Sequence, residues 1–284
     1  MHKQFIENGI AVAIQGYEGS FHEEAARRFF GTGVKPIPCD TFRKVVQLAG
    51  DASQCGTGVM AIENSIAGSI LPNYTLLQKS KLCIVGEVYL TIKQQLLVNP
   101  GVQLQDIREV HSHPMALLQC MDYLEQFPHW KLIETEDTAL SAKHIHQRKS
   151  RHQAAIAGKL ASELFSLEVL APDIHTLKNN YTRFLVVKPQ GTMPVPKDAN
   201  KASVKFHTDH SKGSLAHALV IIAEGGVNLS KLQSMPIPGT HFKYSFHADM
   251  EFESLTQFES MIQQLEKATE EIRIFGIYKN GKDT

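Results

Sequence analysis

A proline-bearing segment divides the chain into two parts whose secondary-structure patterns differ. The segment KPQGTMPVPKDANK, residues 188–201, contains three prolines and no apolar periodicity, which is typical of a linker. Before it, short apolar stretches alternate with helical patterns, which predicts an α/β domain with crossover connections and two sub-lobes. After it, the predicted order is β-α-β-β-α-β, the ferredoxin-like arrangement of an α+β domain. We therefore expect a first domain at 1–188, a linker at 189–201 and a second domain at 202–284.

Composition excludes several classes of partner. The 284-residue chain has 29 basic and 29 acidic residues, so no overall charge favours nucleic acid or an anionic membrane. Its apolar runs are too short to span a membrane, and the N-terminus lacks the apolar core of a signal peptide. The four cysteines are scattered without a CxxC motif, which favours reduced thiols in the cytoplasm. We expect a cytoplasmic protein with neither a nucleic-acid nor a membrane partner.

The chain has 14 histidines, so metal sites need to be considered. The pairs His111 with His113 and His144 with His146 lack the HExxH form and neighbouring cysteine ligands. We therefore expect no metal and no other cofactor.

The first predicted helix begins beside two glycines. Ser20 is a suitable N-cap with Glu23 three residues later, and the helix follows the loop that contains Gly16 and Gly19. A helix start presents free N–H groups and a partial positive charge, so it favours an anion. The glycine spacing fits neither dinucleotide nor P-loop motifs, and a carboxylate is the better candidate.

Polar side chains follow the strand predicted at residues 59–62. Glu63, Asn64 and Ser65 come directly after it, at the carboxyl end of the strand, where open α/β sheets place ligands. An alternative for Asn64 is that it only shapes the turn.

A second polar group surrounds the helix predicted at Pro114. Ser112 lies in the preceding turn, where it could cap the helix, line a site or do both. Gln119 lies on an otherwise apolar helix, and a buried amide there needs partners, of which a ligand is one candidate.

The segment NNYTRFLVV, residues 179–187, places a hydroxyl, a cation and an aromatic ring at the start of a buried strand. Two interpretations fit these residues: Thr182, Arg183 and Phe184 lie either at an exposed strand edge or in a functional site. The surrounding motifs favour a site.

Four segments in this order resemble the prephenate dehydratases that carry a C-terminal ACT domain. They are GYEGSFHEEAA, AIENSIAGSI, HSHPMALLQC and NNYTRFLVV, and the tail GSLAHALVIIAEGGVNLSKLQSMPIPG resembles the ACT module. The resemblance covers residues 8–278. It implies two α/β lobes similar to periplasmic solute-binding proteins with the active site in the cleft between them. The strand after Arg183 is then expected to return to the first lobe.

The resemblance also implies which residues form the site. Thr182 is the expected catalytic hydroxyl, and Asn64, Ser65, Ser112 and Gln119 are expected to line the cleft.

Further residues match family positions. Ser20 matches the serine of the N-terminal loop, and Phe184 completes the Thr-Arg-Phe motif as a substrate-binding residue. Glu63 is expected to bind substrate and Glu136 also matches, although both acids could equally be structural.

These residue types suit the reaction that the resemblance implies, the conversion of prephenate to phenylpyruvate, CO2 and water in phenylalanine biosynthesis. The difficult step is loss of a hydroxyl, which needs hydrogen bonding or proton donation and orientation of both ends of the substrate. Thr182 is suited to donate to that hydroxyl, although a neighbour or a water must share proton delivery. The planar cation of Arg183 suits the pyruvyl carboxylate, so Arg183→Ala should mainly raise KM. The ring carboxylate should lie among weaker dipoles, because a strong clamp would stabilise the ground state.

Three places depart from the family pattern. His22 stands where many relatives carry a small hydroxyl residue, and the ACT-like segments Gly213-Ser214-Leu215-Ala216 and Gln233-Ser234-Met235-Pro236 differ from the usual Gly-Ala-Leu-Val and Glu-Ser-Arg-Pro. We still expect feedback inhibition by phenylalanine. The expected allosteric residues are Gly213, Leu215, Asn228, Leu229, Ser234 and Pro236.

The sequence leaves assembly and specificity open. An ACT-like sheet with exposed edges favours a homodimer, and a homotetramer is a further option. Arogenate, which carries an amine in place of the side-chain keto group, is an alternative substrate. A third alternative is that the chain is not an enzyme but an amino-acid sensor. Incubation with prephenate and with arogenate distinguishes such a sensor from a lyase.

Overall fold

The structure is a computed structural model that describes residues 9–283 apart from positions 210, 238 and 242. The chain divides into two compact units. The first comprises Met1–Ser80 with Val88–Val186, and the second comprises Lys81–Glu87 with Val187–Thr284. No helix among the described residues is long and apolar enough to cross a membrane.

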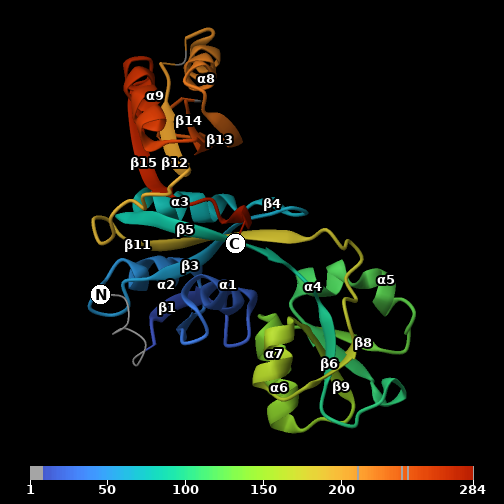
Figure 1. Ribbon diagram of the computed structural model, residues 1–284. Helices are drawn as coiled ribbons and strands as arrows, with labels where there is room; N and C mark the ends of the chain where they lie inside the picture. The colour runs from blue at the N-terminus through green and yellow to red at the C-terminus, as the bar shows by residue number, and fades with distance from the viewer. Residues whose placement is uncertain (1–8, 210, 238, 242, 284) are drawn as a thin grey trace. The chain divides into compact units, whose positions relative to one another are not determined.

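The first sheet has the strand order β2-β1-β3-β11-β5, with β4 paired to β3 (Figure 1). Its strands are β1 (Ala11–Gln15), β2 (Lys35–Cys39), β3 (Gly58–Asn64), β4 (Gly68–Ser69), β5 (Leu82–Thr91) and β11 (Tyr181–Pro189). The helices of this lobe are α1 (Phe21–Phe30), α2 (Phe42–Ala49) and α3 (Leu71–Lys79). Strand β11 lies between β3 and β5, so the expectation that the chain returns to the first lobe is confirmed.

Local sequence signals explain where this lobe's first helix begins. The Ser20 hydroxyl accepts a hydrogen bond from the Glu23 N–H at 3.4 Å, as the predicted N-cap requires. The Glu23 carboxylate accepts in turn from the Gly19 N–H at 2.7 Å. The loop between β1 and α1 is therefore held from both sides, which fixes the amino-terminal turn of α1.

The second sheet has the order β10-β6-β9-β7-β8. Its strands are β6 (Gln95–Val98), β7 (Glu109–Ser112), β8 (Lys131–Glu134), β9 (Gln153–Ala157) and β10 (Glu168–Ala171). Its helices are η1 (Leu104–Asp106), α4 (Pro114–Gln119), α5 (Met121–Leu124), α6 (Thr138–Arg148) and α7 (Lys159–Leu164). Two segments, 92–94 and 172–180, join this lobe to the first sheet. They are bridged where the Ile92 N–H donates to the Asn180 carbonyl at 2.7 Å.

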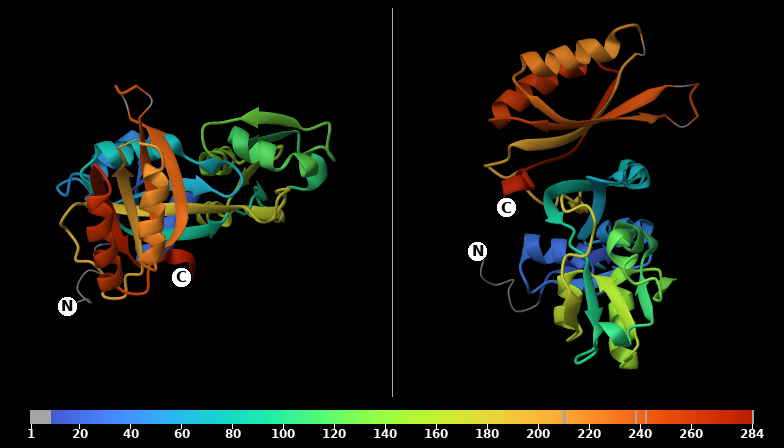
Figure 2. Two further views of the ribbon diagram at one scale, coloured as in Figure 1. Left: turned by 90° about the horizontal axis from the view of Figure 1, so that it is seen from above. Right: turned by 90° about the vertical axis from the view of Figure 1, so that its right-hand side faces the viewer.

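The second unit contains a four-stranded antiparallel sheet in the order β13-β14-β12-β15. Its elements are β12 (Lys201–His207), α8 (Ser214–Glu224), β13 (Asn228–Pro236), β14 (Tyr244–Glu251), α9 (Leu255–Lys267), β15 (Glu271–Tyr278) and η2 (Gly281–Asp283). Both long helices lie on one face of this sheet (Figure 2), and apolar side chains such as Phe206 and Leu265 fill the space beneath them. The predicted β-α-β-β-α-β order is confirmed.

A buried ion pair explains why Lys81–Glu87 belongs to the second unit. The Lys201 ammonium donates to the Glu87 carboxylate at 2.9 Å, and each of the two side chains is at most 1% exposed. The Gly281 N–H also donates to Glu87, at 3.1 Å. The predicted boundary at residue 188 therefore misses a contribution from β5. The predicted linker at 189–201 nearly coincides with residues 190–200, which contain no helix or strand.

Candidate active site

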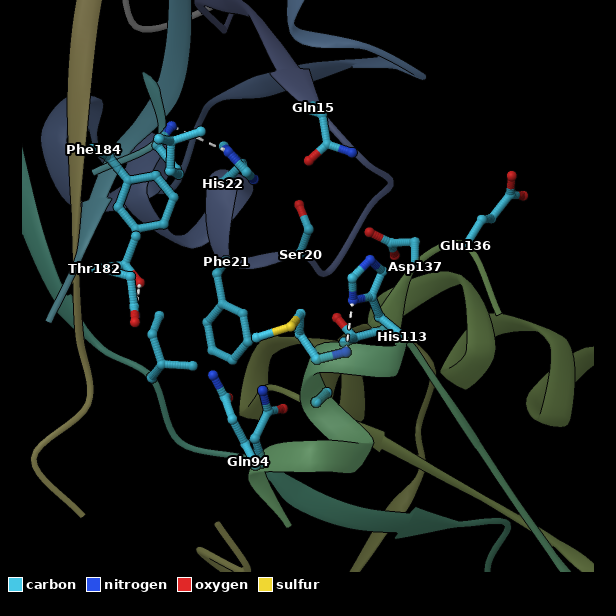
Figure 3. Close-up of a pocket in the computed structure, with 18 of the residues that line it drawn as sticks. Gln15, Ser20, Phe21, His22, Gln94, His113, Glu136, Asp137, Thr182 and Phe184 are labelled. Carbon is cyan, nitrogen blue, oxygen red and sulfur yellow. Dashed lines mark hydrogen bonds between the residues drawn. The ribbon is translucent and has the colours of Figure 1, made fainter. Parts of the chain in front are cut away.

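A cavity of about 290 Å³ opens within the first unit and is lined by residues of both lobes (Figure 3). Its size is near the lower end of small-molecule sites. The first lobe contributes Ser20, Asn64, Thr182 and Phe184 among others, and Gln119 comes from α4 of the second lobe. These five predicted residues are brought together in space. None of the described residues that line the cavity is lysine or arginine.

Thr182 is oriented by Asn64. The Asn64 Nδ2 donates to the Thr182 Oγ1 at 2.9 Å and to the Asn180 Oδ1 at 2.7 Å. Because the Thr182 oxygen accepts this bond, its own hydrogen is free to donate to a group in the cavity. The Thr182 hydroxyl can therefore donate a hydrogen bond to a ligand in the cavity.

Asn64 also shapes the turn that follows β3. Its Oδ1 accepts from the Ile66 N–H at 3.0 Å and from the Ala67 N–H at 2.9 Å. The two interpretations of this residue are therefore compatible, because the amide oxygen serves the turn and the amide nitrogen serves the site.

Asn180 links this group to the second lobe. Its Nδ2 donates to the Gln119 Oε1 at 3.3 Å, while the Gln119 carbonyl accepts from the Thr176 N–H at 2.8 Å. A hydrogen-bonded chain therefore runs from Thr182 through Asn64 and Asn180 to Gln119.

Two helix caps of the second lobe also face the cavity. The His113 Nδ1 accepts from the Met115 N–H at 3.2 Å and caps α4. The Asp137 Oδ1 accepts from the Leu140 N–H at 2.8 Å and caps α6, and burial raises the pKa of Asp137. Glu136, which is exposed, lines the same side of the cavity (Figure 3).

Two predicted cleft residues lie elsewhere. Ser112 is fully buried and donates to the Ile156 carbonyl at 2.6 Å, so it ties β7 to β9; the cap of α4 is its neighbour His113. Arg183 is 5% exposed and its guanidinium carbon lies 6.0 Å from the centroid of the Tyr89 ring. Successive side chains of a strand point to opposite faces, so Arg183 faces away from the cavity that Thr182 and Phe184 line.

Two other predicted residues lie near the site without lining the described cavity. Ser65 donates to the Asn179 carbonyl at 3.2 Å and accepts from the Tyr181 N–H at 2.9 Å, so it fixes the start of β11. Glu63 is half-buried at the register position opposite Ser69 in the β3–β4 pair. For these residues a supporting role fits the geometry better than substrate contact.

The cavity lining also includes residues that were not predicted as site residues, among them Asp137, His113 and Gln94, and His22 was noted only as a departure. Asp137 and His113 stand at helix starts, so capping rules could have drawn attention to them. Gln94 lies in the 92–94 segment, where no periodicity points to it; its Oε1 is buried and has no hydrogen-bond partner among the described residues. His22 lines the cavity on α1.

The six expected allosteric residues lie at two ends of the second unit. Asn228 and Leu229 open the edge strand β13, whereas Ser234 and Pro236 close it. Six residues of strand separate Asn228 from Ser234, which corresponds to about 20 Å. Gly213 and Leu215 stand at the amino-terminal end of α8, and the other end of α8 leads into the start of β13.

Among the described residues, no group of three or more His, Cys, Asp or Glu side chains is arranged to hold a metal ion.

Comparison with known proteins identifies the family. The profile of the family described as "Prephenate dehydratase" matches residues 12–192. The chain belongs to the prephenate dehydratase family. It is accordingly an enzyme of the lyase class.

Named homologous proteins match most of the chain, beyond the residues that the family profile covers. A bifunctional chorismate mutase/prephenate dehydratase of Enterobacter agglomerans is 31% identical, over 94% of this chain and 70% of that protein. Arogenate dehydratase 2 of Petunia hybrida is 33% identical, over 95% of this chain and 71% of that protein.

Solved structures agree with the fold. The prephenate dehydratase of Arthrobacter aurescens in complex with L-Phe has a TM-score of 0.84 at 26% identity and covers 97% of this chain and 91% of its own. GqqA, described as a novel type of quorum quenching acylase, has a TM-score of 0.84 at 28% identity and covers 96% of this chain and 99% of its own.

Proposed function

We propose that this chain converts prephenate to phenylpyruvate, CO2 and water, and that Thr182 donates a hydrogen bond to the departing hydroxyl. The observation that carries this proposal is the bond from the Asn64 Nδ2 to the Thr182 Oγ1, which leaves the threonine hydrogen free to donate to a group in the cavity. A fixed donor at the leaving oxygen costs no reorganisation when charge develops there.

The reaction requires one proton and no redox change. The electrons of the C–CO2 bond move into the ring as CO2 leaves, the ring becomes aromatic, and the C–O bond breaks with its electron pair on oxygen. That oxygen departs as water after gaining a proton. A neutral threonine is too weak an acid to supply this proton alone.

Among the titratable side chains of the second lobe that line the cavity, Asp137 and His113 are the two to which we assign the proton. Burial raises the pKa of Asp137, so its carboxyl retains a proton to higher pH than an exposed aspartate does. His113 has its Nδ1 occupied by the Met115 N–H, so a hydrogen on its ring stands at Nε2. The pH dependence of kcat in Asp137→Asn and His113→Gln variants distinguishes the two: the proton donor is the residue whose replacement removes the basic limb.

We propose carboxylate-binding groups other than Arg183. Arg183 lies on the opposite face of β11, and no described cavity residue is lysine or arginine. We place the pyruvyl carboxylate at the amino-terminal turn of α1, where Ser20 lies at the cavity and backbone N–H groups lack intrahelical partners. Arg183→Ala should then lower stability more than it raises KM.

Arogenate is the second candidate substrate, and a specific observation favours testing it. Glu136 and Asp137 both line the cavity, which has no lysine or arginine among its described lining residues. An ammonium group would be attracted to the Glu136 carboxylate, whereas a keto group would not, and Asp137 adds to this attraction only when it has lost the proton that burial favours. The named likeness to a Petunia arogenate dehydratase is consistent with this alternative.

Acyl-amide hydrolysis is not favoured by the geometry. No hydroxyl of Ser20, Thr138 or Thr182 is hydrogen-bonded to a histidine in the described cavity. A serine or threonine nucleophile needs such a base.

We also propose that the second unit is an ACT domain that binds phenylalanine and inhibits the enzyme. The support is its ferredoxin-like topology and the fold shared with a prephenate dehydratase solved in complex with L-Phe. The expected ligand residues are about 20 Å apart along β13, too far to share one phenylalanine within a single copy. Two copies are therefore needed, and a homodimer is the smallest assembly that provides them, with a homotetramer as a pair of such dimers.

We expect the enzyme to act in the cytoplasm. All four cysteines are free, which suits a reducing compartment.

The decisive experiment is incubation of the full chain with prephenate and, separately, with arogenate. Formation of phenylpyruvate from prephenate supports the main proposal, and formation of phenylalanine from arogenate supports the alternative. If neither substrate gives a product, the chain is a non-catalytic sensor. Thr182→Val and Thr182→Ser form a matched pair: the valine variant keeps the shape and loses the hydroxyl. We expect kcat to fall on the order of 10²- to 10³-fold in Thr182→Val and far less in Thr182→Ser. Equal activity of the two variants would refute the role of the hydroxyl.

Regulation has its own test. Titration with phenylalanine followed by calorimetry and by initial rates should show binding together with inhibition, and sedimentation should show a dimer or tetramer. Absence of both heat and inhibition would refute the regulatory proposal and leave the catalytic one intact.

A further inference from the structure

His22 is a cavity residue whose hydrogen-bonding state is set by the protein. It is the second residue of α1, and its ring lies edge-on to Phe184 with centroids 5.0 Å apart (Figure 3). The ring is also tilted against that of Phe42, with centroids 5.4 Å apart. The His22 Nε2 accepts a hydrogen bond from the Ala61 N–H at 3.3 Å. A nitrogen that accepts from a backbone N–H carries no hydrogen, so the neutral ring holds its hydrogen on Nδ1.

The Nδ1 hydrogen is available to a ligand. His22 lines the cavity, and its Nδ1 makes no hydrogen bond to any described residue. Nδ1 is not one of the described side-chain atoms that are both inaccessible to solvent and without a hydrogen-bond partner. The contacts with the Phe184 and Phe42 rings and the bond to Ala61 hold the ring in one orientation, so Nδ1–H is a fixed donor at the cavity surface.

His22 also stays neutral, because desolvation lowers its pKa to about 4. At neutral pH it therefore offers a hydrogen bond without a positive charge.

His22 packs about one side-chain step along β11 from Thr182. Phe184 lies two residues beyond Thr182 on the same face of β11, which is about 6.6 Å along the strand, and His22 packs on Phe184. The ring carboxylate and the hydroxyl of prephenate stand on opposite sides of a six-membered ring. A donor one side-chain step beyond Thr182 is therefore suited to the end of the substrate that carries the carboxylate.

We propose that the Nδ1–H of His22 donates a hydrogen bond to the ring carboxylate that leaves as CO2. This proposal rests on the dehydratase function proposed above, and it makes His22 a substrate-binding residue at the decarboxylating end. A cation at this position would stabilise the carboxylate most strongly before its charge disperses, and so would slow the reaction. The neutral donor orients the carboxylate and stabilises its negative charge less than a cation would.

Three replacements test the proposal in the full chain. His22→Phe keeps the ring that packs on Phe184 and removes both nitrogens. His22→Asn keeps an N–H near the position of Nδ1, and His22→Gln keeps an acceptor near the position of Nε2. We expect His22→Phe to raise KM for prephenate on the order of tenfold to a hundredfold, as loss of a hydrogen bond to a charged group implies. His22→Asn should recover about tenfold of this loss relative to His22→Phe, and His22→Gln should recover much less.

A product-binding measurement locates the contact. Phenylpyruvate has the pyruvyl group but lacks the ring carboxylate, so its inhibition constant should be the same in wild type and His22→Phe. If that constant rises as much as KM for prephenate, the contact is not with the ring carboxylate and the proposal is wrong. If His22→Gln recovers activity and His22→Asn does not, the residue acts only by holding Ala61, and the proposal is again wrong.

The controls separate folding from function. Thermal unfolding of each variant shows whether it folds, and His22→Asn provides a second test if His22→Phe does not. Turnover of prephenate by the wild type tests the proposed function itself, so failure of that function is distinct from failure of the role of His22.

Discussion

Replacing Asn64 by aspartate or by alanine should separate its two roles. Its Oδ1 holds the turn through the Ile66 and Ala67 N–H groups, and its Nδ2 donates to the Thr182 and Asn180 oxygens. Asn64→Asp keeps the acceptor for the turn and replaces the donor by a second oxygen. Asn64→Ala removes both.

The expected magnitudes follow from these bonds. In Asn64→Asp, the new oxygen attracts the Thr182 hydrogen away from the cavity, so kcat should fall on the order of 10²- to 10³-fold, about 2.7–4 kcal/mol of transition-state stabilisation. The turn is retained, so the stability loss should stay near about 1–2 kcal/mol. Asn64→Ala loses these four hydrogen bonds and a fifth, from Nδ2 to the Tyr181 carbonyl at 3.2 Å, and should cost about 4–5 kcal/mol in stability at about 1 kcal/mol each. Its kcat should fall only about tenfold, because the Thr182 hydrogen remains free.

The two variants should therefore rank in opposite order in two assays. Initial rates of phenylpyruvate formation give kcat, and urea unfolding followed by circular dichroism gives the stability change. A larger kcat loss in Asn64→Ala than in Asn64→Asp would refute the reasoning, because the direction of the Thr182 hydrogen would then not govern turnover.

Three further predictions concern stability and cavity shape. Glu87→Gln removes the nearest carboxylate of the buried Lys201 ammonium, while the Glu251 carboxylate stays at 3.7 Å, and should lower the free energy of unfolding by about 3–5 kcal/mol in urea; a loss below about 1 kcal/mol would contradict this account. Burial lowers the pKa of His247 to about 4 from its ordinary 6.5, so below pH 6.5 the unfolded state binds the proton and the folded state does not. Stability should be complete above pH 6.5 and fall by up to about 3 kcal/mol as the pH approaches 4, and His247→Phe should flatten this dependence in unfolding curves measured at pH 7 and pH 5. Gly16 has a φ of +89°, and a Cβ there would lie 2.6 Å from the Asp137 Oδ2, so Gly16→Ala should lower both the melting temperature and kcat/KM. Unchanged kinetics would show that the cavity tolerates displacement of Asp137.

Local features of this protein follow from its sequence alone. The cap at Ser20, the strand that ends at Asn64 and the β-α-β-β-α-β order after the proline-bearing segment all follow from residues close together in the chain. Short-range hydrogen bonding and side-chain periodicity are sufficient to specify them. The four motifs also indicated the family that the comparisons establish.

Tertiary structure decided which side chains face the cavity. Both Arg183 and Phe184 are buried, so strand β11 has no solvent face whose polarity could reveal which residues face the site. Only pairing between β3 and β5 fixes that choice, and it turns Thr182 toward Asn64, 118 residues away in sequence, and Arg183 toward Tyr89. Contacts at such separations depend on how the sheets assemble, so local pattern could suggest the motif but could not orient it.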